Sequence, residues 1–88
     1  MLLQTSYVLI NSDLGKDVEI IAKIKEMLAD QNDLKFEIQG VYGVYDIILK
    51  LFADDSTKLR SIVTNDIRKI EHVQSTLTMM VIQQQEKS

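Results

Sequence analysis

The order in which two kinds of hydrophobic pattern follow one another restricts the fold of this chain more than any other sequence feature. Two stretches carry apolar residues every three to four positions, which predicts amphipathic helices. Four other stretches are rich in β-branched and aromatic residues, which predicts strands. The expected elements are strands at 2–11, 34–42, 46–52 and 73–83 and helices at 16–29 and 56–70. Their order is strand–helix–strand–strand–helix–strand.

This order predicts an α+β protein with the ferredoxin-like βαββαβ arrangement. Because strand–helix–strand crossovers are right-handed, both helices should cover one face of a four-stranded antiparallel sheet. The first strand should then lie between the third and the last. The length of 88 residues suits one domain. We expect a single domain over 1–88, with its core at about 4–83 and a frayed tail at 84–88.

Composition excludes several classes of protein. The chain has no cysteine and one histidine, which rules out disulfides, thiolate metal sites and multi-histidine metal sites. Its formal net charge of −3 argues against a direct nucleic-acid partner, which requires a basic surface. No apolar run approaches the roughly 18 residues of a membrane span, and the N-terminus lacks the basic leader of a signal peptide. We therefore expect a cytoplasmic protein with no membrane partner, metal or cofactor.

The sheet face that the helices leave open is expected to be apolar. The residues expected there include Val8, Ile10, Ile48, Phe52, Met80 and Ile82. An exposed patch of this size is unusual for a monomer, so a second copy should cover it, sheet to sheet. A C2 homodimer, forming a dimeric α/β sandwich, is the commonest solution. The alternative is that these residues are scattered over the surface and carry no interface.

Asp46 is a polar exception at the start of an apolar strand, directly after a turn that contains Gly43. Its carboxylate suits an ammonium group, while Thr76, Thr78 and the backbone N–H groups around Gly43 suit a carboxylate. A free α-amino acid requires this combination. Because the first strand separates the strands that carry Asp46 and the threonines, the two groups would converge across a dimer interface. Alternatively, Asp46 belongs to the turn and the threonines are ordinary strand residues.

The stretches GVYGVYDIILKL and VQSTLTMMVI resemble the effector-binding (RAM) domain of the leucine-responsive regulator/AsnC family of transcription factors. The family pattern is a glycine, one residue, an aromatic residue, an aspartate and then a hydrophobic strand, which Gly43, Tyr45 and Asp46 match. Thr76 and Thr78 match the Thr-x-Thr pair of the family's closing strand. Family regulators also carry an N-terminal helix-turn-helix and often Pro-Gly turns, whereas this chain starts at its first strand and has no proline.

The resemblance implies a stand-alone ligand-binding and oligomerisation domain that takes part in transcriptional regulation without a DNA-binding domain of its own. Its effector would be an amino acid or a similar small metabolite. In the family the effector binds between subunits, which places the expected site at Gly40, Val41, Tyr42, Gly43, Val44, Tyr45, Asp46, Thr76 and Thr78. The resemblance also implies homodimers that assemble into octamer-like particles or join full-length regulators of the same family.

Two other functions stay open, although we expect no enzymatic activity. A cofactor-free dimeric ferredoxin-like monooxygenase or isomerase would need an acid or base, and the candidates are Asp46 and His72. His72 is expected to be a solvated loop residue, and Asp54 and Asp55 are expected to cap the second helix. A ligand-free interaction domain would have a melting temperature that no metabolite raises.

Overall fold

A computed structural model describes residues 4–82 of the protein. Three of the expectations lie outside these residues: the start of the first strand at residue 2, the end of the last strand at residue 83, and the tail at 84–88. The elements follow the expected order: β1 (Gln4–Ser12), α1 (Asp17–Ala29), β2 (Leu34–Gly40), β3 (Ile47–Ala53), α2 (Ser56–Ser61) and β4 (Val73–Met80). No helix within residues 4–82 is long and apolar enough to cross a membrane.

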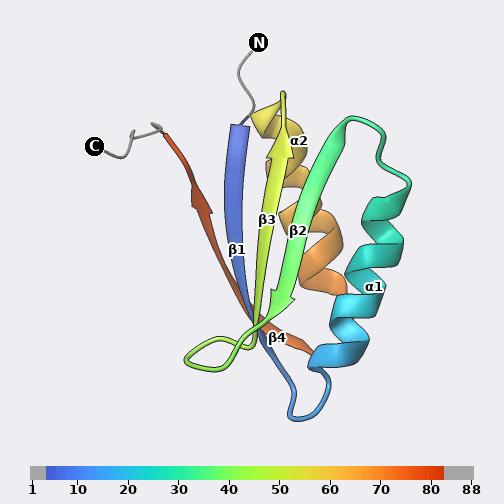
Figure 1. Ribbon diagram of the computed structural model, residues 1–88, viewed down its shortest axis with the longest axis vertical. Coiled ribbons are helices and arrows are strands. Elements are labelled where there is room, and N and C mark those ends of the chain that lie inside the picture. Colours follow the sequence, from blue (N-terminus) through green and yellow to red (C-terminus); the bar gives the residue numbers. More distant parts are fainter. Residues whose placement is uncertain (1–3, 83–88) are drawn as a thin grey trace.

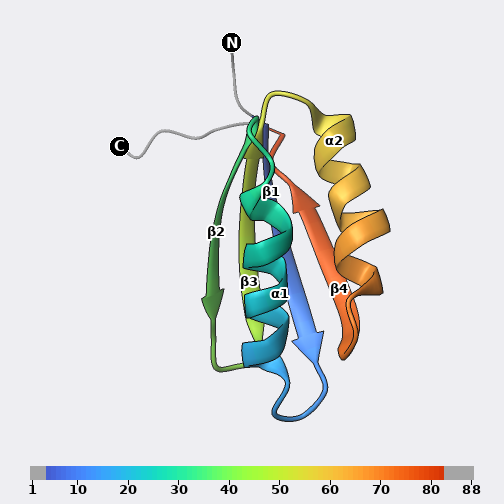
Figure 2. The ribbon, with the colours of Figure 1, turned by 90° about the vertical axis from the view of Figure 1, so that its right-hand side faces the viewer.

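The four strands form one antiparallel sheet in the order β2-β3-β1-β4. Figures 1 and 2 together show α1 and α2 on the same side of this sheet. The ferredoxin-like α+β prediction is therefore confirmed, including the position of β1 between β3 and β4. This topology leaves β2 and β4 as the two edge strands of the described sheet.

The second helical segment is less regular than its hydrophobic pattern predicted. The expected helix at 56–70 is α-helical at Ser56–Ser61, becomes a π-helix at Ile62–Asp66 and ends as a 3-10 helix at Ile67–Lys69. The Ile67 backbone N–H is shared between the carbonyl groups of Ile62 and Val63. A π-turn accommodates one extra residue in the helix, which keeps both Ile62 and Ile67 buried against the sheet.

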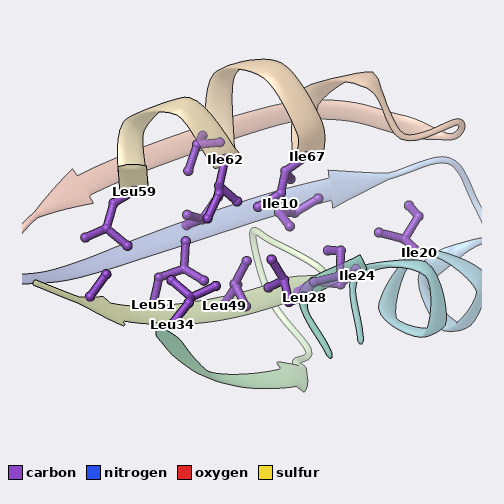
Figure 3. Close-up of a cluster of buried hydrophobic side chains, with 14 residues drawn as sticks. Ile10, Ile20, Ile24, Leu28, Leu34, Leu49, Leu51, Leu59, Ile62 and Ile67 are labelled. Atoms are coloured by element: carbon purple, nitrogen blue, oxygen red, sulfur yellow. The ribbon is translucent and has the colours of Figure 1, made fainter. Parts of the chain in front are cut away.

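The hydrophobic core lies between the helices and the sheet, as Figure 3 shows. Alternation along β3 brings Ile47, Leu49 and Leu51 into it, and all three are fully buried. Both helices contribute residues at helical spacing, such as Ile20 and Ile24 from α1. The complete core is Val8, Ile10, Ile20, Ile24, Leu28, Leu34, Ile47, Leu49, Leu51, Ala53, Leu59, Ile62, Val63 and Ile67.

The strand registers correct the expected composition of the open sheet face. Val8, Ile10 and Met80 point to the helix side, because Val8 lies opposite Leu49, Ile10 opposite Ile47, and Met80 packs against the core. Of the expected residues, Ile48 and Phe52 are on the open face, and Ile82 follows the end of β4. The expectation was wrong for Val8 and Ile10 because β1 has apolar residues on both faces, and for Met80 because the neighbouring Met79 is the one that faces the open side.

The open face is nevertheless rich in apolar side chains. The registers place on it Tyr7, Leu9, Ile48, Phe52, Leu77 and Met79. Leu77 and Met79 are 45% and 46% exposed. The Lys50 ammonium lies 5.3 Å from the ring centre of Tyr7 and 5.1 Å from that of Phe52, within the range of cation–π attraction. These apolar residues lie towards β1, β3 and β4, while Lys35, Glu37 and Gln39 make the β2 side polar.

Candidate effector-binding site

Two loops meet at one end of the sheet, the connection between β1 and α1 and the connection between β2 and β3 (Figure 1). The β2–β3 loop is closed at its base, since the Val41 N–H donates to the Asp46 carbonyl at 2.8 Å. The Asp46 N–H donates to the Ile10 carbonyl at 3.0 Å, which fastens the loop to β1. The tip beyond this base projects into solvent, with Tyr42 and Val44 fully or almost fully exposed.

Asp46 is held rigidly where the two loops meet. Its Oδ2 atom accepts hydrogen bonds from the Ser12 N–H at 2.9 Å and from the Ser12 hydroxyl at 3.2 Å. The side chain is half-buried. Both of these bonds end on the same carboxylate oxygen, which leaves Oδ1 as an acceptor. The carboxylate therefore joins the β2–β3 loop to the end of β1 and can also bind a cation.

A hollow of about 430 Å³ lies beside Asp46. Its lining consists of Ser12, Asp13, Leu14, Gly15, Asp17, Val41, Tyr42, Asp46 and Gln74. Three of these residues are aspartates, and none is Lys or Arg. The excess of negative charge favours an ammonium group over an anion. Leu14, which is fully exposed, and Tyr42 add apolar surface at the rim.

His72 is not the solvated loop residue that the sequence suggested. It is half-buried, has a positive φ of 76° and its Nδ1 lies 3.0 Å from Asp13 Oδ2. The Asp13 N–H also donates to the His72 carbonyl at 2.8 Å. The hydrogen bond from His72, helped by one from Gln74, holds the pKa of Asp13 below its ordinary value. This pair fastens the β1–α1 loop to the start of β4.

The structure separates the two halves of the expected ligand set. Thr76 lies opposite Ile10 of β1 on one side, while Asp46 reaches Ile10 from the other side through its backbone. Thr76 and Thr78 belong to the helix side of β4, and Thr76 lines a different hollow of about 210 Å³ together with Arg68. Within one chain the threonine pair therefore does not face the hollow beside Asp46.

The expected loop residues are close to Asp46 but contribute unequally. Val41 and Tyr42 line the hollow, whereas Gly40, Gly43, Val44 and Tyr45 are not among its lining residues. The glycine with a left-handed backbone is Gly15, at φ 77° in the β1–α1 loop, and not Gly43 in the turn before Asp46. An added methyl group at Gly43 would meet nothing within 4 Å, and one at Gly40 would be in ordinary contact with Ile21 Cδ1 at 3.5 Å, so neither position is sterically restricted to glycine.

Sequence reasoning missed the contribution of the β1–α1 loop. Ser12, Asp13 and Leu14 fall between the strand expected at 2–11 and the helix expected at 16–29, and in the structure they form one wall of the hollow. The available signal was the position of Asn11-Ser12-Asp13 directly after a buried strand and before Gly15. Residues 4–82 contain no group of three or more His, Cys, Asp or Glu side chains that could hold a metal ion.

A comparison with protein-family models decides the family. The model of the Lrp/AsnC ligand binding domain matches residues 12–88, which is most of the chain. The chain belongs to the Lrp/AsnC ligand-binding domain family. The resemblance seen in the Gly43–Asp46 and Thr76–Thr78 motifs is thereby confirmed. No curated protein is similar enough to this sequence to count as a match.

Solved structures agree with this assignment. FFRP-DM1 is 34% identical, with a TM-score of 0.72, and the match covers 90% of this chain and 99% of that one. A hypothetical protein, PHS023 from Pyrococcus horikoshii, is 33% identical with a TM-score of 0.70 and 92% coverage of both chains. AsnC of E. coli shares the fold at a TM-score of 0.74 and 22% identity, and its match covers 97% of this chain but 54% of AsnC.

One further neighbour was solved with a ligand. The transcriptional regulator NMB0573 of Neisseria meningitidis, described as a complex with L-Met, is 12% identical with a TM-score of 0.70. The match covers 97% of this chain and 53% of that regulator. This likeness concerns the fold. The family assignment itself gives the chain the role of a regulatory effector-binding domain.

Proposed function

We propose that this Lrp/AsnC ligand-binding domain binds a free amino acid, with the carboxylate of Asp46 holding the ligand's ammonium group. The observation that carries the proposal is the fixed, half-buried carboxylate beside the 430 Å³ hollow. Ser12 fixes Asp46 through one oxygen, so the carboxylate is oriented before a ligand arrives. A preorganised charged acceptor gains affinity because little side-chain freedom is lost on binding. Binding, rather than an enzymatic reaction, is the proposed activity.

The ligand's carboxylate needs donors that the acidic hollow does not supply. We assign this role to backbone N–H groups of residues 42–45 around Gly43, in the exposed loop next to Asp46, because the Val41 N–H already bonds to the Asp46 carbonyl. Contacts from Thr76 and Thr78 would have to come from a second chain, because β1 lies between them and Asp46 within one chain. The L-Met complex described for NMB0573 makes L-methionine the first compound to test.

We also propose that the open sheet face is an interface with a second copy. The phase of β4 supports this proposal. Leu77 and Met79 point to the side that carries no helix, whereas Thr76 and Thr78 point to the helix side. In a monomer the more apolar set is expected to face the helices. A partner on the open face would bury these residues, and ligand-dependent changes in assembly, or joining of full-length regulators of the family, would transmit effector binding to transcription.

The test of the effector site is binding of the twenty amino acids, screened by thermal shift and measured by calorimetry. Asp46→Asn keeps an oxygen that accepts the Ser12 N–H but removes the charge. A charge-assisted hydrogen bond contributes about 1.5–3 kcal/mol, so the affinity should fall about 10- to 100-fold. Asp54→Asn, which changes an exposed acid outside the hollow, is the matched control. Equal affinity of Asp46→Asn and the unmodified protein would remove Asp46 from the site.

A further inference from the structure

A further hollow lies between the two helical segments. Its volume is about 450 Å³, which is within the range of small-molecule sites. Glu19, Lys23 and Met27 of α1 form one wall, and residues 66 and 69–72, at the end of the second helical segment, form the other. Figure 2 shows α1 and this segment along the same side of the sheet. We call this hollow the interhelix cleft, and its lining differs at every residue from that of the hollow beside Asp46.

The local sequence explains why the two walls face each other. Glu19, Lys23 and Met27 are spaced four residues apart, so they form one stripe along α1. On the other wall, the π-turn at Ile62–Asp66 adds one residue. This rotates the residues after it by about 100°, which is one residue's share of a 3.6-residue turn. An uninterrupted α-helix over 56–70 would point those residues in another direction, and π-turns recur at functional sites.

The floor of the interhelix cleft is apolar. Met27 and Ile70, one from each wall, are half-buried and pack against the hydrophobic core. A methionine side chain is flexible and adapts to the shape of what it contacts. The charged residues of the lining are more exposed than these two and form the rim. An apolar floor below a charged rim suits a ligand with one charged end and a short apolar chain.

Two of the three acids on the rim already have a partner. Glu19 accepts a hydrogen bond from Lys16 Nζ at 3.3 Å. Glu71 Oε1 lies 3.9 Å from His72 Nε2, at the outer limit of an ion pair, while His72 Nδ1 contacts Asp13. These acids therefore contribute little to neutralising the lysines of the rim.

The two lysines of the rim have no such partner. Lys23 of α1 and Lys69 of the opposite wall form no ion pair with any residue from 4 to 82. Asp66, the third acid, forms none within the same residues. Two positive charges beside one negative charge favour an anion with a single charge. A carboxylate carries one charge, whereas a phosphate monoester carries up to two.

We propose that the interhelix cleft binds a small organic acid, with Lys23 and Lys69 holding its carboxylate and Met27 and Ile70 contacting its apolar chain. Hydrogen bonds from an ammonium group to a carboxylate are among the stronger ones in proteins. The ligand needs no ammonium group of its own, and the cleft does not include Asp46. The proposal therefore does not rest on amino-acid binding.

Hexanoate is the probe, because it combines one carboxylate with a short apolar chain. Protein labelled with carbon-13 at its methionine methyl groups is titrated with hexanoate, and NMR follows Met27 in the cleft and Met79 on the open sheet face. Met27→Leu assigns the Met27 signal. This signal should shift until it saturates, and acetate should bind at least about tenfold more weakly because it has almost no chain to cover the floor. Absence of a saturable Met27 shift, with or without a shift of Met79, would overturn the proposal.

Lysine variants and a ligand of opposite charge test the rim. Lys23→Gln and Lys69→Gln should each weaken hexanoate binding about threefold, and their combination about tenfold, because each removes a charged partner of the carboxylate. Lys25→Gln alters the net charge equally at an exposed position of α1 outside the cleft, and it should keep the affinity. Circular dichroism establishes that each variant is folded. Hexylammonium should bind at least about tenfold more weakly than hexanoate. Equal affinity of all the lysine variants, or equal affinity for the two ligands, would contradict the proposal.

Discussion

Asp13 and Asp46 stand at the same end of the sheet but perform different tasks. Asp46 joins two loops through Ser12 and borders the proposed ligand position. Asp13 joins the β1–α1 loop to the start of β4 through His72, which adopts a left-handed backbone to reach it. Such a conformation is uncommon for a residue with a side chain. The Asp13–His72 hydrogen bonds therefore determine the geometry of one wall of the hollow.

This contact predicts a loss of stability in acid. The hydrogen bond from His72 lowers the pKa of Asp13 from its ordinary value of 3.8, so the unfolded chain takes up the proton at a higher pH than the folded chain. The stabilisation is complete above pH 3.8 and disappears as the pH falls through the lower, folded pKa. Urea unfolding at a series of pH values between 5 and 2.5 should show this slope, and Asp13→Asn should make it shallower.

Two variants test the cause of that slope. His72→Gln removes the principal hydrogen-bond partner and should flatten the slope, but less than Asp13→Asn does, because the hydrogen bond from Gln74 to Asp13 remains. Asp33, whose pKa is lowered chiefly by its hydrogen bond with Lys58, accounts for a separate part, so Asp13→Asn combined with Asp33→Asn should be flatter still. An unaltered slope in Asp13→Asn would contradict the assignment.

At the scale of elements, the sequence predicts the type and order of every strand and helix but not the phase of the strands. β1 is apolar at Tyr7, Val8, Leu9 and Ile10, so its pattern does not show which set faces the helices. The register with β3 decides it by placing Val8 opposite Leu49. Likewise, the site residues of the β1–α1 loop could not be found from spacing, since their approach to Asp46 depends on sheet pairing between residues far apart in sequence.

The expected cap of the second helix is confirmed for Asp55 but not for Asp54, and it gives a local prediction. Asp55 is the N-cap of α2, and its carboxylate accepts a hydrogen bond from the Thr57 N–H at 2.9 Å. Removing an N-cap side chain typically costs about 1 kcal/mol. Asp55→Ala should therefore lower the free energy of unfolding by about 1 kcal/mol in urea titrations. Asp54→Ala, the neighbouring acid outside the cap, should have a much smaller effect, and equal losses would argue against the cap.

At the scale of the whole molecule, the two layers leave one face of the sheet without covering helices. The two helices cover one side of the sheet, and the other side carries a row of residues that runs across the strands from Leu77 through Leu9 and Ile48 to Gln39. Three of the four are apolar, and the polar one lies on β2. The proposed face-to-face interface should therefore be centred on β1 and β3.

This row supplies a matched pair of substitutions. Leu9→Glu places a charge in the centre of the proposed interface, where burial of an unpaired carboxylate is unfavourable, and should halve the mass measured by light scattering at micromolar concentration. Gln39→Glu adds the same charge in the same row, at the exposed polar side, and should leave the mass unchanged.

Because association stabilises the folded state by mass action, the melting temperature of the unmodified protein should also rise with protein concentration. That dependence should weaken in Leu9→Glu. If both variants keep the mass of the unmodified protein, or if the unmodified protein is already a monomer, the open face is not an interface between copies, and any effector site shared by two chains must be built elsewhere.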